Sequence, residues 1–198
     1  LSNNYSKHSE GLLFLKYSYM NFIMFTLLLL AVSVIAVSLM TIYWFGGMLI
    51  PLFAGGAPYV PTPDKKVELM IKLAQVQSSD KVMDLGSGDG RLLIASVQAG
   101  AKRAIGYEIH HGLAKLSRHN IRKYNLQDKI HVFNKSFWNA DVSGASLVLL
   151  YQIPNAMEKL GNKLRHQLPK GARVVSNGFE FPDWEPTESN TKVFLYIV

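Results

Sequence analysis

Seven consecutive residues near the middle of the chain have the composition of a pocket for a nucleotide-like ligand. Residues 84–90 are Asp-Leu-Gly-Ser-Gly-Asp-Gly; they follow a short apolar run at 81–83 and precede a segment typical of a helix start at Arg91. The alternate glycines let the backbone turn tightly and approach a ligand with no Cβ in the way. The helix start supplies unpaired N–H groups and a partial positive charge. We therefore predict a ligand pocket between a strand and the following helix.

A second carboxylate lies at a spacing that suits a ribose. Glu108 ends the β-prone segment 102–108 and lies 24 residues after Asp84. An acid about 20 residues beyond the glycine turn commonly binds ribose hydroxyls in folds of this kind. Without a ligand, residues 84–90 would be a glycine turn of an ordinary α/β protein, and Glu108 would be a solvated acid at a strand end. Two signals at the right spacing favour a binding site.

The glycine spacing indicates which ligand the pocket holds. Dinucleotide-binding folds use G-x-G-x-x-G, but Arg91 occupies the third glycine position here. The pattern Asp-x-Gly-x-Gly-x-Gly instead resembles motif I of class I S-adenosylmethionine (SAM)-dependent methyltransferases. SAM has no pyrophosphate, and the carboxylate of Asp84 suits its cationic methionine end. The predicted cofactor is SAM.

Helices and strands must alternate around this pocket to form it. We predict strands ending at Asp84 and Glu108 and then over 129–134, 145–151, 171–177, 184–188 and 192–198, with a turn near 189–190; the predicted helices are 67–75, 90–99, 113–124 and 155–167. Such alternation predicts an α/β, Rossmann-like sheet, mostly parallel with one antiparallel C-terminal strand. The binding crevice is expected at the carboxyl ends of the strands.

An apolar segment precedes this domain. The 47 residues 17–63 contain no charged residue or histidine, and residues 22–45 are almost wholly apolar. As a helix, 24 residues span roughly 36 Å, enough for a bilayer core of ~30 Å. A signal peptide would have a shorter apolar core, and soluble core helices seldom stay uncharged for so long. We predict a tail at 1–21, a transmembrane helix at 22–45, an interfacial linker at 46–56 and a catalytic domain at 57–198.

The composition limits the kinds of metal, nucleic acid and lipid partner that we expect. The 198-residue chain has no cysteine, a net charge of +7 and a pI of about 9.5, and its histidines lack metal-ligand spacing, so no metal is expected. No RNA-binding signature is present and no nucleic-acid partner is expected. A basic domain beside a bilayer favours anionic lipid. The positive-inside rule favours a domain on the cytoplasmic or matrix side. We expect a single-pass membrane protein: in the mitochondrial inner membrane in a eukaryote, or in the cell membrane with a cytoplasmic domain in a prokaryote.

Six segments, taken in order, resemble a small family of protein-lysine methyltransferases that includes archaeal enzymes and the ATP synthase c-subunit lysine N-methyltransferases. The segments are 58–63 (Pro-Tyr-Val-Pro-Thr-Pro), 84–91, 106–109, 150–155, 174–184 and 193–197. The resemblance covers roughly residues 57–198. It implies a SAM-dependent protein-lysine N-methyltransferase.

The resemblance also implies roles for individual residues. Tyr59 and Thr62 would close over SAM, and Glu108 would hold its ribose. The methionine part would be held by Asp84, Gly86, Ser87, Gly88, Asp89 and Gly90. Ser136 stands where the family usually offers an acid toward the adenine. Residues 177–178 are Asn-Gly where relatives often carry His-Asp.

Methyl transfer to lysine needs alignment and a neutral amine rather than strong acid–base groups. Tyr151 and Tyr59 are the predicted catalytic walls that orient the amine, and Pro154 and Asn155 would shape the substrate opening. Tyr151 has the alternative of simply packing on a helix. The acceptor is expected to be a membrane-protein lysine, such as one on the ATP synthase c-subunit. The alternatives are a small or lipid-like acceptor, such as a quinone precursor, and a non-catalytic SAM-binding assembly factor.

Overall fold

The computed structural model of the chain describes residues 2–53 and 59–198, with side chains at 15–43 and 59–198. The chain divides between Gly46 and Gly47 into two compact units. Each unit is described by itself below.

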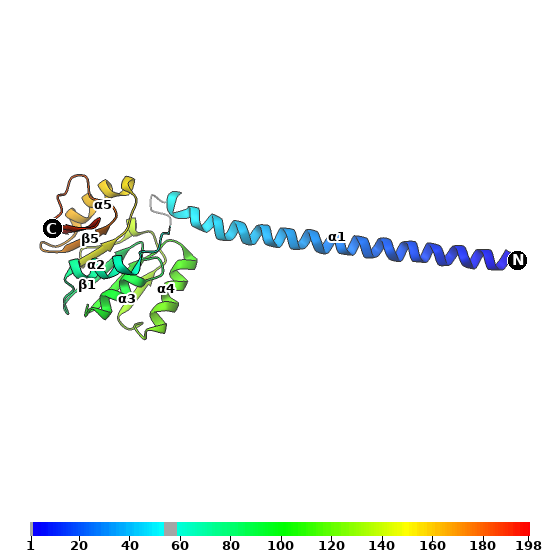
Figure 1. Cartoon of the computed structure of the whole chain (residues 1–198), viewed down its shortest axis with the longest axis horizontal. Helices are drawn as coiled ribbons and strands as arrows, with labels where there is room; N and C mark the ends of the chain where they lie inside the picture. Colours follow the sequence, from blue (N-terminus) through cyan, green and yellow to red (C-terminus); the bar gives the residue numbers. More distant parts are fainter. Residues whose placement is uncertain (1, 54–58) are drawn as a thin grey trace. The chain divides into compact units, whose positions relative to one another are not determined.

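The N-terminal unit belongs to one helix, α1 (Ser2–Phe53), drawn in blue to cyan in Figure 1. The helix does not stop at Gly46 and Gly47, as an interfacial linker from residue 46 would suggest, but continues through Pro51. A glycine inside a helix costs only about 1 kcal/mol, which apolar neighbours can outweigh. Residues 54–56 of the predicted linker and residues 57–58 of the predicted domain lie outside the described residues. The predicted domain limits therefore stay predictions.

Residues Leu15–Tyr43 of α1 are long and apolar enough to cross a bilayer, by length and composition. Three hydroxyl groups of this stretch bond back to the helix. Thr26, Ser33 and Thr41 donate to backbone carbonyls three or four residues earlier at 2.7–2.8 Å. A hydroxyl satisfied in this way is cheaper to remove from water.

The C-terminal unit is built on a seven-stranded sheet with the order β3-β2-β1-β4-β5-β7-β6. The strands are β1 (Lys81–Leu85), β2 (Arg103–Tyr107), β3 (Ile130–Phe133), β4 (Leu147–Leu150), β5 (Arg173–Asn177), β6 (Glu188–Asn190) and β7 (Val193–Ile197). The helices are α2 (Asp64–Ala74), α3 (Arg91–Gln98), α4 (His111–Lys123) and α5 (Pro154–Gln167), with a 3-10 turn, η1 (Phe137–Asn139). Strands β1 to β5 are parallel, and β7 runs antiparallel to β5. The predicted α/β, mostly parallel sheet is confirmed.

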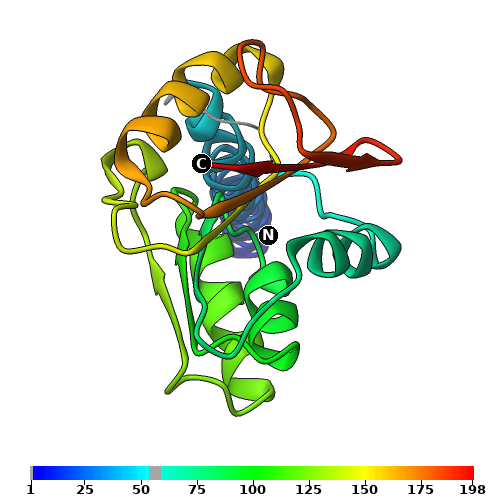
Figure 2. The same ribbon diagram turned by 90° about the vertical axis from the view of Figure 1, so that its left-hand side faces the viewer.

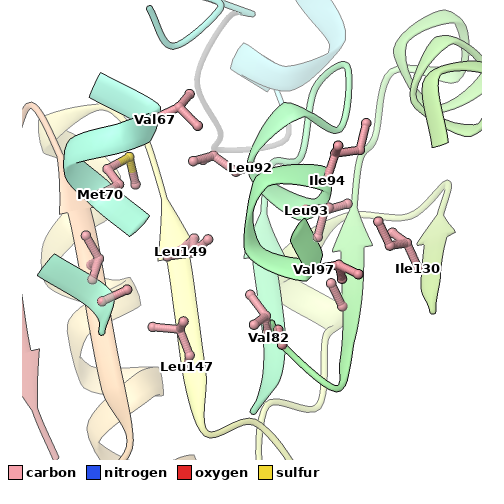
Figure 3. Packing of buried hydrophobic residues seen from close by; sticks show 14 of the residues in the cluster. Val67, Met70, Val82, Leu92, Leu93, Ile94, Val97, Ile130, Leu147 and Leu149 are labelled. Atoms are coloured by element: carbon pink, nitrogen blue, oxygen red, sulfur yellow. The ribbon is translucent and has the colours of Figure 1, made fainter. Parts of the chain in front are cut away.

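Alternate residues of the strands point to opposite faces and form two apolar cores. Val82 and Leu149 face α2 and α3, where they belong to one cluster with Met70 of α2 and Leu93 of α3 (Figure 3). Met83, Val148 and Leu150 face the other way, and α5 covers that face (Figure 2). The fully buried strand β4 at the centre confirms the long apolar run predicted at 145–151.

The C-terminal hairpin differs from the prediction. Its first strand is β6, not 184–188, and the turn is Thr191-Lys192, not Ser189-Asn190. Both turn residues have positive φ, 48° and 60°, as a two-residue type I′ turn requires. Such turns usually contain asparagine or glycine, and Asn190 therefore led to a predicted turn that is two residues too early in the sequence. The predicted strand segment instead contributes Trp184, whose ring packs 5.0 Å from that of Tyr196.

A polar lock joins the elements at the amino-terminal edge of the sheet. Asp80, 1% exposed, accepts hydrogen bonds from Ser146 Oγ and Gln77 N, both at 2.7 Å, and pairs with Arg173. Although burial alone would raise the pKa of Asp80, these bonds lower it. Arg173 also donates to two carbonyls at the end of α2, at 2.6 and 2.7 Å. The lock thus ties α2, β4 and β5 together at the edge opposite the glycine loop.

Candidate cofactor and active site

The two predicted acids lie at the carboxyl ends of adjacent parallel strands. Asp84 is on β1, opposite Gly106 of β2, and Glu108 follows β2 directly. Asp84 is 2% exposed, and within residues 59–198 its Oδ2 atom has no hydrogen-bond partner. Burial raises the pKa of Asp84 well above its ordinary value, and the charges of Glu108 and Asp89 raise it further. An unpaired buried carboxyl is costly alone but suits a cationic ligand group.

The Glu108 carboxylate is held by the backbone. It accepts from Gly88 N at 2.9 Å and from His110 N at 2.7 Å. Burial raises the pKa of Glu108, and these N–H groups offset part of that rise. Asn134, after β3, donates to the carbonyls of Glu108 and Ile109 at 2.9 and 3.0 Å and so fixes the turn that carries the acid.

The glycine loop is packed so closely that side chains would not fit. Gly86 and Gly88 have φ of 101° and 52°, in the left-handed region. A Cβ on Gly86 would lie 2.6 Å from Gln152 Nε2, and one on Gly88 would lie 2.7 Å from the ring of Tyr59. Between them, Ser87 is buried, and its Oγ has no partner in the part of the domain that the structure describes. The close packing therefore requires glycine at both positions, and the Ser87 side chain lies against Gly106 of β2.

Tyr59 and Thr62, predicted to close over the cofactor, do lie against this loop. The Tyr59 ring covers Gly88, and its hydroxyl lies beside the side chains of Asp89 and Arg91. Burial, followed by the charge of Asp89, raises the pKa of Tyr59, so the hydroxyl stays a donor. Thr62 is buried, and its carbonyl accepts from Arg91 Nη1 at 2.7 Å.

Asp89 is engaged within the protein. Arg91 donates to both of its carboxylate oxygens, at 3.0 Å from Nε and 2.7 Å from Nη2. Although burial alone would raise the pKa of Asp89, the bonds to Arg91 and Tyr59 lower it. Its predicted contact with the methionine part stays a prediction. Gly90, the last glycine, has a φ of 85° and starts α3, close to Ser117 of α4.

The predicted acceptor side is built at the ends of β4 and β5. Tyr151 follows β4, and a Cβ on Gly178 would lie 2.9 Å from its ring. Gly178, with φ of 88°, follows the buried Asn177 that ends β5. Pro154 and Asn155 begin α5 and are exposed, as an opening to the site would be.

Ser136 lies after β3, at the end of the sheet's outer parallel strand. Its hydroxyl caps η1 by accepting from Trp138 N at 3.4 Å, a long bond. The side chain is half-buried. The hydroxyl has a local role in shaping η1, and its predicted place at the adenine stays a prediction.

Two site residues escaped the sequence prediction. Gln152, 3% exposed, donates to the carbonyl of Leu85 at 2.7 Å and supports the glycine loop from beneath. Asn134 orients the Glu108 turn from a different strand. The one available signal for Gln152 was a polar residue two positions after the apolar strand β4. Its bond to Leu85 and the bond from Asn134 to Glu108 join residues far apart in the sequence.

These features fit SAM on structural grounds. In residues 59–198, the end of β1 leaves a buried carboxyl oxygen without a partner, at the carboxyl edge of the sheet and next to the strand that carries a second acid. Asp84 would face the ammonium group, and Glu108 would accept from ribose hydroxyls. The fold and this site define a class I SAM-dependent methyltransferase. A solved structure agrees: an RNA methyltransferase from Salinibacter ruber in complex with S-adenosyl-L-homocysteine has a TM-score of 0.67 and 36% identity, covering 70% of this chain and 93% of that one.

The chain belongs to the ANTKMT methyltransferase family, whose domain matches residues 84–188. A protein-lysine N-methyltransferase of Saccharolobus islandicus is 37% identical over 150 residues, which are 71% of this chain and 93% of that relative. The mouse adenine nucleotide translocase lysine N-methyltransferase is 33% identical over 71% of this chain, and the human ATP synthase c-subunit lysine N-methyltransferase is 33% identical over 65%. The chain spans only 63% and 54% of these two mammalian proteins.

Proposed function

We propose that the protein is a membrane-anchored, SAM-dependent protein-lysine N-methyltransferase. The proposal rests on a buried Asp84, whose Oδ2 atom has no partner within residues 59–198, next to a backbone-held Glu108. It rests equally on a family whose relatives are named for lysine methylation. When bound, SAM supplies an electrophilic methyl group to a nucleophilic nitrogen. The protein must hold the donor, orient the acceptor and keep water away.

On the acceptor side, the residues provide shape and a partly dry environment. Tyr151 is fixed between the end of β4 and Gly178, so its ring would form one wall of the acceptor site. A lysine amine that leaves bulk water there loses part of its preference for the charged form, which favours the neutral nucleophile. Tyr59 would line the donor side, because its ring already lies on Gly88.

The acceptor is proposed to be a lysine near a bilayer surface. Leu15–Tyr43 supports a membrane anchor by length and composition. Relatives named for the adenine nucleotide translocase and for the ATP synthase c-subunit make the c-subunit lysine, or one on a comparable membrane protein, a reasonable target to test. The location would be the mitochondrial inner membrane in a eukaryote or the cell membrane in a prokaryote.

Transfer of a radioactive methyl group tests the proposal. The full chain, in membranes from a strain lacking the enzyme, is supplied with methyl-labelled SAM, and label is measured in protein, organic and RNA fractions. Label on lysine in a membrane protein, located by peptide mass spectrometry, is the expected result. Label in the organic phase would support a small or lipid-like acceptor, label in RNA would point to nucleic acid, and no label despite SAM binding would support a non-catalytic assembly factor. Asp84→Asn serves as the inactive control.

A further inference from the structure

A short strap crosses the glycine loop just before α2. Residues 59–63 are described as an extended segment without regular secondary structure. On its C-terminal side the strap is fixed, because Lys66 N and Val67 N donate to the carbonyl of Pro63 at 2.8 and 3.0 Å. Val67 then enters the buried core.

One arginine joins this strap to the loop beneath it. Arg91 donates to the carbonyl of Thr62 at 2.7 Å and to the carboxylate of Asp89 at 2.7–3.2 Å. Arg91 also forms a weak ion pair with Asp64, at 3.8 Å between Nη1 and Oδ1, and the Asp64 side chain is exposed. A planar guanidinium can hold a carboxylate with two donors while a third donor reaches elsewhere, whereas a lysine ammonium cannot reproduce this geometry.

The strap's tyrosine meets the same carboxylate. The Tyr59 hydroxyl lies beside the side chains of Asp89 and Arg91, while its ring lies on Gly88, whose N–H in turn holds Glu108. The Asp89–Arg91 pair is therefore the place where the strap meets the loop. Opening the strap would separate Tyr59 and the Thr62 carbonyl from this pair together.

We propose that Arg91 is a positioning residue: through Asp89 and the Thr62 carbonyl it keeps the strap closed over the glycine loop, and this closure retains SAM in its site. The inference deepens the proposed function, since it concerns the cofactor side of the same site. Arg91 acts through Asp89 and the strap and is not proposed to touch the reacting methyl group or the acceptor.

The test uses the full chain in lipid nanodiscs and two readouts that need no acceptor. Affinity for S-adenosylhomocysteine is measured by calorimetry. Strap motion is followed by a nitroxide on Val60→Cys, since Val60 is 55% exposed and the chain has no other cysteine. A nitroxide on Leu116→Cys of α4 is the matched label control, because Leu116 is also exposed.

Arg91→Ala is expected to weaken binding about tenfold or more, as loss of bonds to a charged group implies. It is also expected to increase nitroxide mobility at position 60 but not at 116. Arg91→Lys is expected to retain only part of the affinity and only part of the restriction of the nitroxide at position 60. Arg165→Ala removes an exposed arginine of α5 and is expected to change neither the affinity nor the nitroxide mobility. Tyr59→Phe and Arg91→Ala should combine less than additively, because both act through Asp89.

Unchanged affinity in a folded Arg91→Ala variant would overturn the proposal, and so would weaker binding with an unchanged signal at position 60. If Arg91→Ala does not fold by circular dichroism, Arg91→Lys and Tyr59→Phe are measured in the same two ways, and the same results support or overturn the proposal. If the proposed acceptor is wrong, the binding and nitroxide results are unaffected. If Arg91 does not hold the strap closed, the methyl-labelling result is unaffected.

Discussion

The amide of Gly88 donates a 2.9 Å hydrogen bond to Glu108, so the glycine loop and the second acid form one unit. The acid is not a free side chain at the pocket edge. One of its oxygens orders the loop and the other binds His110 N. A change at Glu108 must therefore disturb both ligand contacts and loop conformation.

Glu108→Gln is expected to weaken S-adenosylhomocysteine binding by about tenfold or more, because the amide loses one of the two oxygens that accept backbone N–H groups. Calorimetry on the full chain checks this. Glu158→Gln, on the exposed side of α5, is the matched control and should bind like the parent. Equal affinities of the two variants would show that Glu108 holds neither ligand nor loop.

Asp84→Asn is expected to stabilise the ligand-free protein. The folded-state pKa of Asp84 is raised, so ionising it costs stability as the pH rises above the ordinary aspartate range. The neutral variant avoids that cost, and the gain in Tm should grow between about pH 4 and neutrality, at about 2–4 °C per kcal/mol. Thermal melts across this range measure it. A Tm difference that does not change with pH would contradict the raised pKa.

The same titration predicts how ligand affinity depends on pH. The ionised form of Asp84 balances the ligand ammonium, so affinity should fall on acidification, beginning above the usual aspartate range because the pKa is raised. Calorimetry from neutral to mildly acidic pH provides the measurement. Asp84→Asn should bind weakly with a flatter profile; affinity that increases in acid would rule out this role.

Gly178→Ala is expected to reduce methyl transfer with little change in S-adenosylhomocysteine affinity, because its Cβ would displace the Tyr151 ring. Gly171→Ala is a close control: its φ is 81° against 88°, but its Cβ would meet nothing within 4 Å. Both carry the left-handed backbone cost of about 1–2 kcal/mol. Tyr151→Phe should likewise slow transfer while binding stays intact. Equal rates for the two glycine variants would exclude Tyr151 from the acceptor site.

Membrane anchoring can be tested by placing a charge in α1. Ile35→Arg lies well inside Leu15–Tyr43 and should cost about 2.5–3.5 kcal/mol of insertion. The parent is expected to resist alkaline carbonate extraction, and the variant to do so less completely. Ser2→Arg, near the helix start, is the control. Extraction of the parent itself would argue against a span.

The sequence could predict the parts of the fold set by local pattern. The strand at 145–151 and the places of Asp84 and Glu108 at two strand ends were predicted from local strand and helix patterns. The structure has β4 within that run, and the two acids at the ends of the adjacent strands β1 and β2. The turn at Thr191-Lys192 lacked the usual residues, and the hairpin was misplaced for that reason.

The supporting contacts were beyond the sequence for a different reason. The bond from Gln152 to Leu85 joins residues 67 positions apart, and the bond from Asn134 to Glu108 joins residues 26 apart. No periodicity encodes such pairs. The bond from Arg91 to the Thr62 carbonyl, 29 positions away, was hidden in the same way, although Arg91 itself stood out where dinucleotide folds need a glycine.

The lock around Asp80 and Arg173 lies at the far edge of the sheet from every residue proposed to meet a ligand. This structural lock is thus separate from the side chains that would decide what the protein modifies. An exchange of the loops at the carboxyl ends for those of a relative would leave the lock untouched. That separation makes this small domain a practical starting point for retargeting.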